Sequence, residues 1–181
     1  MLKDANQHEV GSESEEHHSH KTSNFVIVNN MADQDIAQKD TYFVAVKLFL
    51  ERDGKLFIFK DKFGVWDLPG GRIKKHEFET PIKDIIARKI YEEIGTDLQY
   101  EVSDFPEVLM RHERVEASPG NPTVRIFGLG YRAQWKSGEP KLSEAHTEML
   151  WVDLNNFNPE EYFTGGWLKG VQEYLVLKNY K

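Results

Sequence analysis

Three absences limit what this chain can be. Its 181 residues include no cysteine, which excludes disulfide bonds and thiol chemistry and is compatible with the cytoplasm, our expected location. The net charge of −7 argues against nucleic acid as the main partner. The hydrophobic runs are short and are interrupted by Lys47 and Lys60, so no segment is expected to cross a membrane.

The length and composition fit one domain with a polar extension. Residues 1–22 combine Glu, Ser and His with almost nothing apolar, which predicts a solvated tail. Residues 23–40 are expected to form a short edge strand at 24–28 and a linker, and residues 41–181 the folded domain.

Strand patterns recur through the second part of the chain. They cover 42–46 and 55–59, joined by a turn at Asp53-Gly54, and then 98–102, 108–114, 123–135 and 149–152. A helix is expected after Thr80 and another over 167–178, with Leu168, Val171, Tyr174 and Leu175 on the buried side of the second. Irregular alternation of strands and helices predicts an α/β fold with a mixed sheet between helices.

The first helix has clear boundary signals. Thr80 suits the N-cap, Pro81 suits the first helical position, and Gly95 suits the left-handed residue that closes a helix. Between them, isoleucine recurs every fourth residue, at Ile82, Ile86, Ile90 and Ile94. This spacing predicts one buried ridge along the helix.

Four charged residues lie beside that ridge. Helical spacing places Arg88, Lys89, Glu92 and Glu93 together, with Glu93 at the edge of the apolar sector, where a carboxylate is costly without a cationic partner. Two surface ion pairs at i,i+4, Arg88–Glu92 and Lys89–Glu93, are the simpler interpretation. They leave the Gly70-Gly71 turn before the helix unexplained.

Turn and helix together resemble the signature of the Nudix hydrolases, G-x5-E-x7-R-E-U-x-E-E-x-G-U, where U is aliphatic. The matching residues are Gly71, Glu77, Arg88, Ile90, Glu92, Glu93 and Gly95. Ten residues separate Glu77 from Arg88 where the signature has seven, and Thr96 takes its last aliphatic position. Lys89 stands where the signature has a glutamate, which is a metal ligand in the family.

The resemblance covers about residues 41–181 and implies a Nudix-type α/β/α sandwich with a mixed sheet. It implies a Mg²⁺-dependent hydrolase, with Mn²⁺ as an alternative ion, that acts on a nucleoside diphosphate linked to another moiety. Glu92, Glu93 and the backbone of Gly71 are the expected metal ligands, because Mg²⁺ favours oxygen donors on a rigid element. A homodimer is compatible with this picture.

Further site residues follow from the same stretch. Arg72 and the Gly70-Gly71 backbone are candidate contacts for the substrate phosphates. Arg88 is expected to orient the glutamates or brace the loop, as the matching arginine does in the family. Glu77 is a candidate supporting carboxylate, and Glu79 is its alternative because the loop is longer.

A second group of polar residues precedes the strand at 149–152. Glu144, His146 and Glu148 are each able to take a proton from an attacking water, and this segment resembles a late loop that supplies a base in many Nudix enzymes. A polar turn is the simpler interpretation. An aromatic platform for a nucleobase is also expected, and the candidates are Tyr42, Phe63, Trp66 and Trp135.

Two other functions stay open. Lys89 and the longer loop favour a Nudix-like binding or regulatory module that has lost most of its chemistry. A GDP-sugar hydrolase that cleaves a C–O bond is the other alternative, because the signature of such relatives is also altered.

The polar tail leads to a test. Deleting residues 1–22 should leave the melting temperature and the activity of the protein nearly unchanged, because the segment has almost no apolar surface to bury. Thermal unfolding of the two proteins measures this directly, and a large drop in melting temperature would show that the tail packs on the domain.

Overall fold

The computed structural model describes residues 38–116, 119–120 and 122–179. The chain divides into two units, Met1–Thr41 and Tyr42–Lys181, and the fold below is that of the second. The expected tail and the expected strand at 24–28 lie outside the described residues.

The described residues of this unit form two helices, eight strands and two short 3₁₀ turns. In chain order they are β1 Phe43–Arg52, β2 Lys55–Asp61, β3 Trp66–Asp67, β4 Gly70–Arg72, η1 Lys75–Glu77, α2 Ile82–Ile94, β5 Gln99–Val102, β6 Val108–Val115, β7 Thr123–Ser137, β8 His146–Asp153, η2 Pro159–Glu161 and α3 Gly165–Leu177.

The sheet is mixed and splits along part of its length. β1 pairs parallel with β7 along most of its length but pairs with β2 only at residues 51–52. Away from the hairpin turn, β1 pairs with β4 and β2 pairs with β3. The short segment 66–72 therefore runs between β1 and β2. β8 pairs with β2, while β5 and β6 pair with β7.

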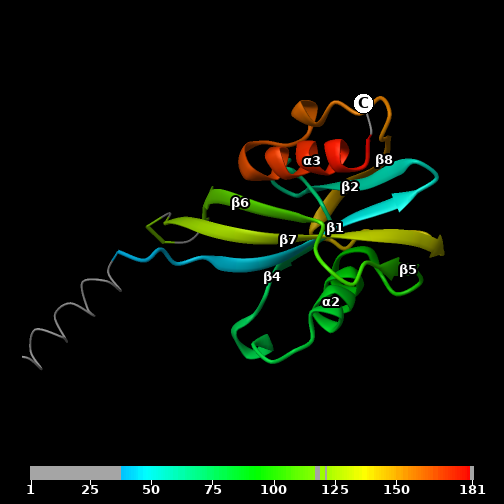
Figure 1. Ribbon diagram of the computed structural model, residues 1–181. Helices are drawn as coiled ribbons and strands as arrows, with labels where there is room; N and C mark the ends of the chain where they lie inside the picture. The colour runs from blue at the N-terminus through cyan, green and yellow to red at the C-terminus, as the bar shows by residue number, and fades with distance from the viewer. Residues whose placement is uncertain (1–37, 117–118, 121, 180–181) are drawn as a thin grey trace, which may run out of the picture. The chain divides into compact units, whose positions relative to one another are not determined.

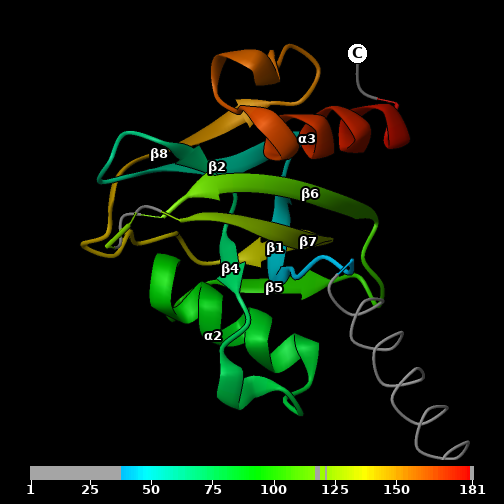
Figure 2. The ribbon, with the colours of Figure 1, turned by 90° about the vertical axis from the view of Figure 1, so that its left-hand side faces the viewer.

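A helix covers each face of the sheet, as Figures 1 and 2 show, with α3 on one side and α2 on the other. Under α3, Phe49 and Tyr174 stack at 3.9 Å between ring centroids. Under α2, the ridge residues Ile86, Ile90 and Ile94 pack on the opposite face of β1 and β2. This arrangement is the expected α/β/α sandwich.

The local predictions hold with small shifts. Asp53 and Gly54 both have positive φ in the hairpin turn, as an Asp-Gly turn requires. Helix α2 ends at Gly95 with φ of 90°, but it begins at Ile82, and Pro81 rather than Thr80 takes the N-cap position. The prediction that Thr80 is the N-cap was therefore wrong. Strand β8 begins at His146, three residues before the expected strand.

The second helix, α3, covers Gly165–Leu177, close to the expected 167–178. Val171, Tyr174 and Leu175 are buried on its inner side, as expected. Within the described part of the chain, no helix has both the length and the apolar character needed to span a membrane.

A buried acid connects the sheet to α3. Glu51, only 4% exposed, accepts a hydrogen bond from the Tyr174 hydroxyl at 2.5 Å and from Arg132 at 3.0 Å. Burial, together with the bond to Glu51, raises the pKa of Tyr174, so its hydroxyl stays protonated and donates.

Tyr174→Phe should lower the free energy of unfolding by about 1–3 kcal/mol, because a buried carboxylate loses a donor while the aromatic stacking stays. Tyr162→Phe is the matched control, since its hydroxyl makes no hydrogen bond to another described residue. Urea unfolding compares the two variants, and equal losses would mean that the hydroxyl of Tyr174 adds nothing to stability.

Candidate active site

The Gly70-Gly71 turn lies in the split of the sheet, beside the last turn of α2. Gly70 has φ of +138°, and a Cβ on it would stand 2.1 Å from the carbonyl oxygen of Val46. Only glycine therefore fits here. Its amide donates a 2.7 Å hydrogen bond to Oε2 of Glu93, which fixes the turn to the helix.

Glu93 is partly buried at the edge of the apolar face of α2, as its position in the helix predicts. Burial raises the pKa of its carboxyl to about 7, against the opposing effects of the Lys47 charge, the Gly70 amide and the Lys89 charge. The carboxyl thus faces a turn, two lysines and little water.

Glu92 is surrounded by cations. Burial would raise its pKa, but hydrogen bonds from Arg88 at 2.8 Å and Lys74 at 3.1 Å, together with the charge of Lys89, lower it to about 2. The expected Arg88–Glu92 pair is therefore present, and Glu92 is a fixed anion at neutral pH.

Glu77 braces the long loop before α2. It is buried and accepts from the Lys74 amide at 2.7 Å and from Arg88 at 2.8 Å. These hydrogen bonds and the charge of Arg88 lower the pKa of Glu77, the amide bond contributing most. Glu79 is exposed, so the structure favours Glu77 for the supporting role, and Arg88 links it to Glu92.

Lys89 does not pair with Glu93 as expected for residues four apart. Its Nζ lies 3.6 Å from Oε2 of Glu92 instead. A Cβ on Gly71 would stand 2.9 Å from the same Nζ, so the ammonium group lies directly against the glycine turn.

Sequence reasoning missed the ion pair between Lys47 and Asp67. Lys47 is 4% exposed on β1, and its Nζ lies 2.6 Å from Oδ2 of Asp67 and 3.3 Å from the carbonyl oxygen of Leu68. The Trp167 ring lies over it at 5.1 Å. A lysine inside an otherwise apolar strand was the available signal, because such a residue is seldom buried without a partner.

His146 is the best positioned of the three expected bases. The amide of Ser143 donates to the carbonyl of Glu93 at 3.0 Å, and the Ser143 hydroxyl lies 3.0 Å from Nδ1 of His146. Burial lowers the pKa of His146, against the opposing charges of Asp67 and Asp61, and this shift favours the neutral ring.

The two carboxylates near His146 are less well placed. Glu144 is exposed, and Glu148 forms an ion pair with Lys60 at 3.0 Å. Among the described residues, neither carboxylate forms a hydrogen bond with Ser143, the residue that connects His146 to the end of helix α2.

Arg72 lies at the other end of the turn. Its guanidinium pairs with Glu116 at 3.1 Å and lies 5.1 Å from the centroid of the Phe43 ring, which is 48% exposed. Phe43 was not among the expected aromatic platforms. Trp135 of that set packs under α2 and donates to the carbonyl of Gly138.

The residues expected to hold Mg²⁺ do not fit it in this arrangement. Glu92 already accepts from two cations, Glu93 accepts from an amide, and the Lys89 ammonium group covers Gly71. Among the described residues, no three His, Asp or Glu side chains come together as a metal-binding group. Dependence on Mg²⁺ or Mn²⁺ stays a prediction.

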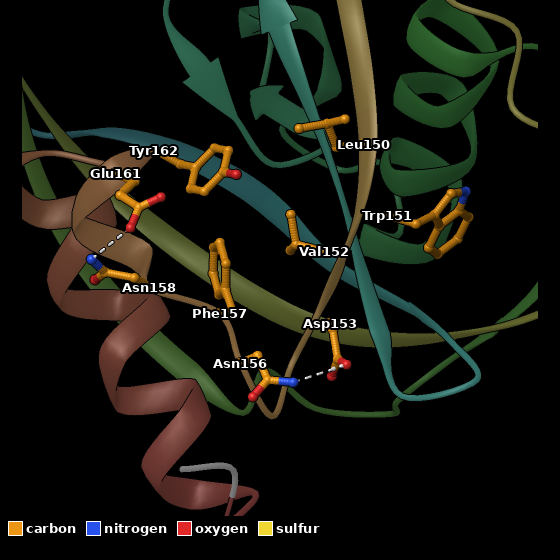
Figure 3. A pocket seen from close by; sticks show the side chains of 9 residues that line it. All are labelled: Leu150, Trp151, Val152, Asp153, Asn156, Phe157, Asn158, Glu161 and Tyr162. Carbon is orange, nitrogen blue, oxygen red and sulfur yellow. Dashed lines mark hydrogen bonds between the residues drawn. The ribbon is translucent and has the colours of Figure 1, made fainter.

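A hollow of about 340 Å³ lies elsewhere, between β8 and η2 (Figure 3). Val152, Phe157 and Tyr162 face it, whereas Trp151 points to the opposite side of the strand. None of the expected site residues lines it.

No protein-family model and no curated protein matches the sequence. Solved structures do match it. A MutT protein from Methanosarcina mazei Go1 has a TM-score of 0.60 and 20% identity, over 79% of this chain and 99% of that chain. A MutT Nudix hydrolase from Burkholderia pseudomallei has a TM-score of 0.53 and 23% identity, over 74% of this chain and 98% of that chain. An ADP-ribose pyrophosphatase from Streptococcus suis has a TM-score of 0.54 and 16% identity, over 76% of this chain and 92% of that chain.

The fold of this chain is therefore the Nudix fold, as the signature in the sequence implied.

The turn gives a test that separates close packing from backbone strain. Gly70→Ala should destabilise the protein more than Gly64→Ala. Both residues have positive φ, which costs an L residue about 1–2 kcal/mol, but only Gly70 would also place its Cβ against a backbone carbonyl. Urea unfolding of both variants measures the difference. Equal losses would contradict the close approach of the turn to β1.

Proposed function

We propose that this domain hydrolyses a phosphoanhydride bond in a nucleoside diphosphate linked to another moiety. The observation that carries the proposal is the link between His146 and the end of helix α2: Ser143 contacts His146 and donates to the backbone carbonyl of Glu93, whose carboxylate accepts from the Gly70-Gly71 turn. The similar solved structure of an ADP-ribose pyrophosphatase supports this substrate class, because ADP-ribose is a nucleoside diphosphate joined to a second group.

His146 is proposed as the general base. When Nδ1 is protonated and donates to the Ser143 hydroxyl, the lone pair of Nε2 is free to accept a proton from water. The water oxygen then attacks phosphorus, the bridging P–O bond breaks, and the two products are a nucleoside monophosphate and a phosphorylated group.

Positive groups are proposed to hold the phosphates during attack. Arg72 follows the glycine turn directly and has a guanidinium that suits two phosphate oxygens. Its present partner Glu116 would be exchanged for the substrate. Phe43, exposed beside Arg72, offers an aromatic face to a base.

A second candidate function is a binding module for the same ligands. The observation that favours it is the set of cations around Glu92, which leaves the acidic pair neutralised by the protein itself. Such a domain would hold a diphosphate without cleaving it.

Product analysis of a panel of ADP-ribose, UDP-glucose and GDP-mannose distinguishes these functions. The proposal predicts a monophosphate product for at least one compound, with ¹⁸O from labelled water in a phosphate group. Label in the sugar would instead identify C–O cleavage. Binding without any product would identify a binding module and contradict the hydrolase.

Two variants test the base. His146→Gln should lower kcat by about 10²–10⁴-fold with little change in KM, because proton transfer is lost while substrate contacts stay. Glu144→Gln, at an exposed position on the same segment, should keep the kcat of the natural protein. The reverse pattern would assign the base to Glu144.

A further inference from the structure

The Lys89 ammonium group lies beside Glu92 and against the glycine turn. Its side chain is 15% exposed, and Nζ lies 3.6 Å from Oε2 of Glu92 and 2.9 Å from where a Cβ on Gly71 would stand. The charge of Lys89 also lowers the pKa of both Glu92 and Glu93, although burial is the largest influence on each group. One ammonium group therefore acts on both carboxylates and on the turn.

The charge of a second lysine, on the sheet, also acts on Glu93. Lys47 is held by Asp67 and by the carbonyl of Leu68, and its charge acts on Glu93 as well. The Glu93 carboxyl thus has a fixed lysine on β1 and another on its own helix. Lys47 is already paired with Asp67, which leaves Lys89 as the lysine that lies against the turn.

Fixed charges of this kind can meet a diphosphate directly. The substrate presents negative oxygens, and a lysine with little solvent around it donates charge-assisted hydrogen bonds to them. Gly71 has no side chain that would displace the Lys89 ammonium group, so this group lies against the turn with part of its side chain exposed to solvent.

We infer that Lys89 supplies, as part of the protein, the positive charge that a divalent ion would otherwise bring to this helix, so that the site binds the diphosphate group of its ligand without Mg²⁺. The inference rests on the proposed function for its substrate class. It does not depend on whether the bound ligand is then cleaved.

Calorimetric titration of the full chain with inorganic pyrophosphate and with ADP-ribose tests this, once in EDTA and once with millimolar Mg²⁺. The expected result is equal affinity in both buffers for at least the nucleotide. Binding of pyrophosphate alone would show that the site takes the free anion rather than a nucleotide diphosphate, and would still support the inference.

Variants at position 89 make the test specific. Lys89→Gln should weaken binding about tenfold or more in both buffers, because a charge-assisted hydrogen bond is lost. Lys89→Arg should keep most of the affinity. Lys89→Glu should abolish binding in EDTA and restore it with Mg²⁺.

Lys83→Gln is the matched control, since Lys83 lies on the same helix and pairs with Asp104 at 2.7 Å, away from the turn. It should bind like the natural protein. Thermal unfolding of every variant confirms that each is folded.

Binding by the natural protein only in Mg²⁺, equal affinity of Lys89→Gln and the natural protein, or no binding in either buffer would each overturn the inference. Binding in EDTA without hydrolysis of any compound would overturn the proposed function and leave the inference standing. Mg²⁺-dependent binding with hydrolysis would do the opposite.

Discussion

The hydrogen bond from the Gly70 amide to the Glu93 carboxylate joins the two parts on which the candidate site depends. It connects a turn inside the split sheet to the end of helix α2. The turn can reach this place only because Gly70 has no side chain to meet the carbonyl of Val46. Ser143 then binds the carbonyl of Glu93, so the same helix end positions the segment that carries His146.

Around that bond the charges form a balanced set within the described part of the chain. Glu77 and Glu92 share Arg88, Glu92 also meets Lys74, and Asp67 holds Lys47. A carboxylate taken out of water is costly unless such partners are present. In this chain the partners are side chains of the protein, and Lys89 is the one that lies against the turn.

The local features were predictable from sequence, and the tertiary ones were not. The Asp53-Gly54 turn and the isoleucine ridge depend on neighbours in the chain, so they follow from spacing alone. In the sequence, Lys47 is a break in a hydrophobic strand. Only the insertion of β3 and β4 between β1 and β2 reveals its partner Asp67. The position of the Lys89 ammonium group likewise depends on how the glycine turn folds against the helix, and a helical projection of the sequence does not show this.

Lys89 is proposed to take the place of a metal ion beside Glu92, Glu93 and the glycine turn. A crystal of the full chain soaked in Mn²⁺, measured with anomalous X-ray scattering, tests it most directly. The expected result is electron density for the Lys89 ammonium group against Gly71 and no anomalous peak between the two glutamates. A manganese peak within ligand distance of both carboxylates, with Lys89 displaced, would contradict it.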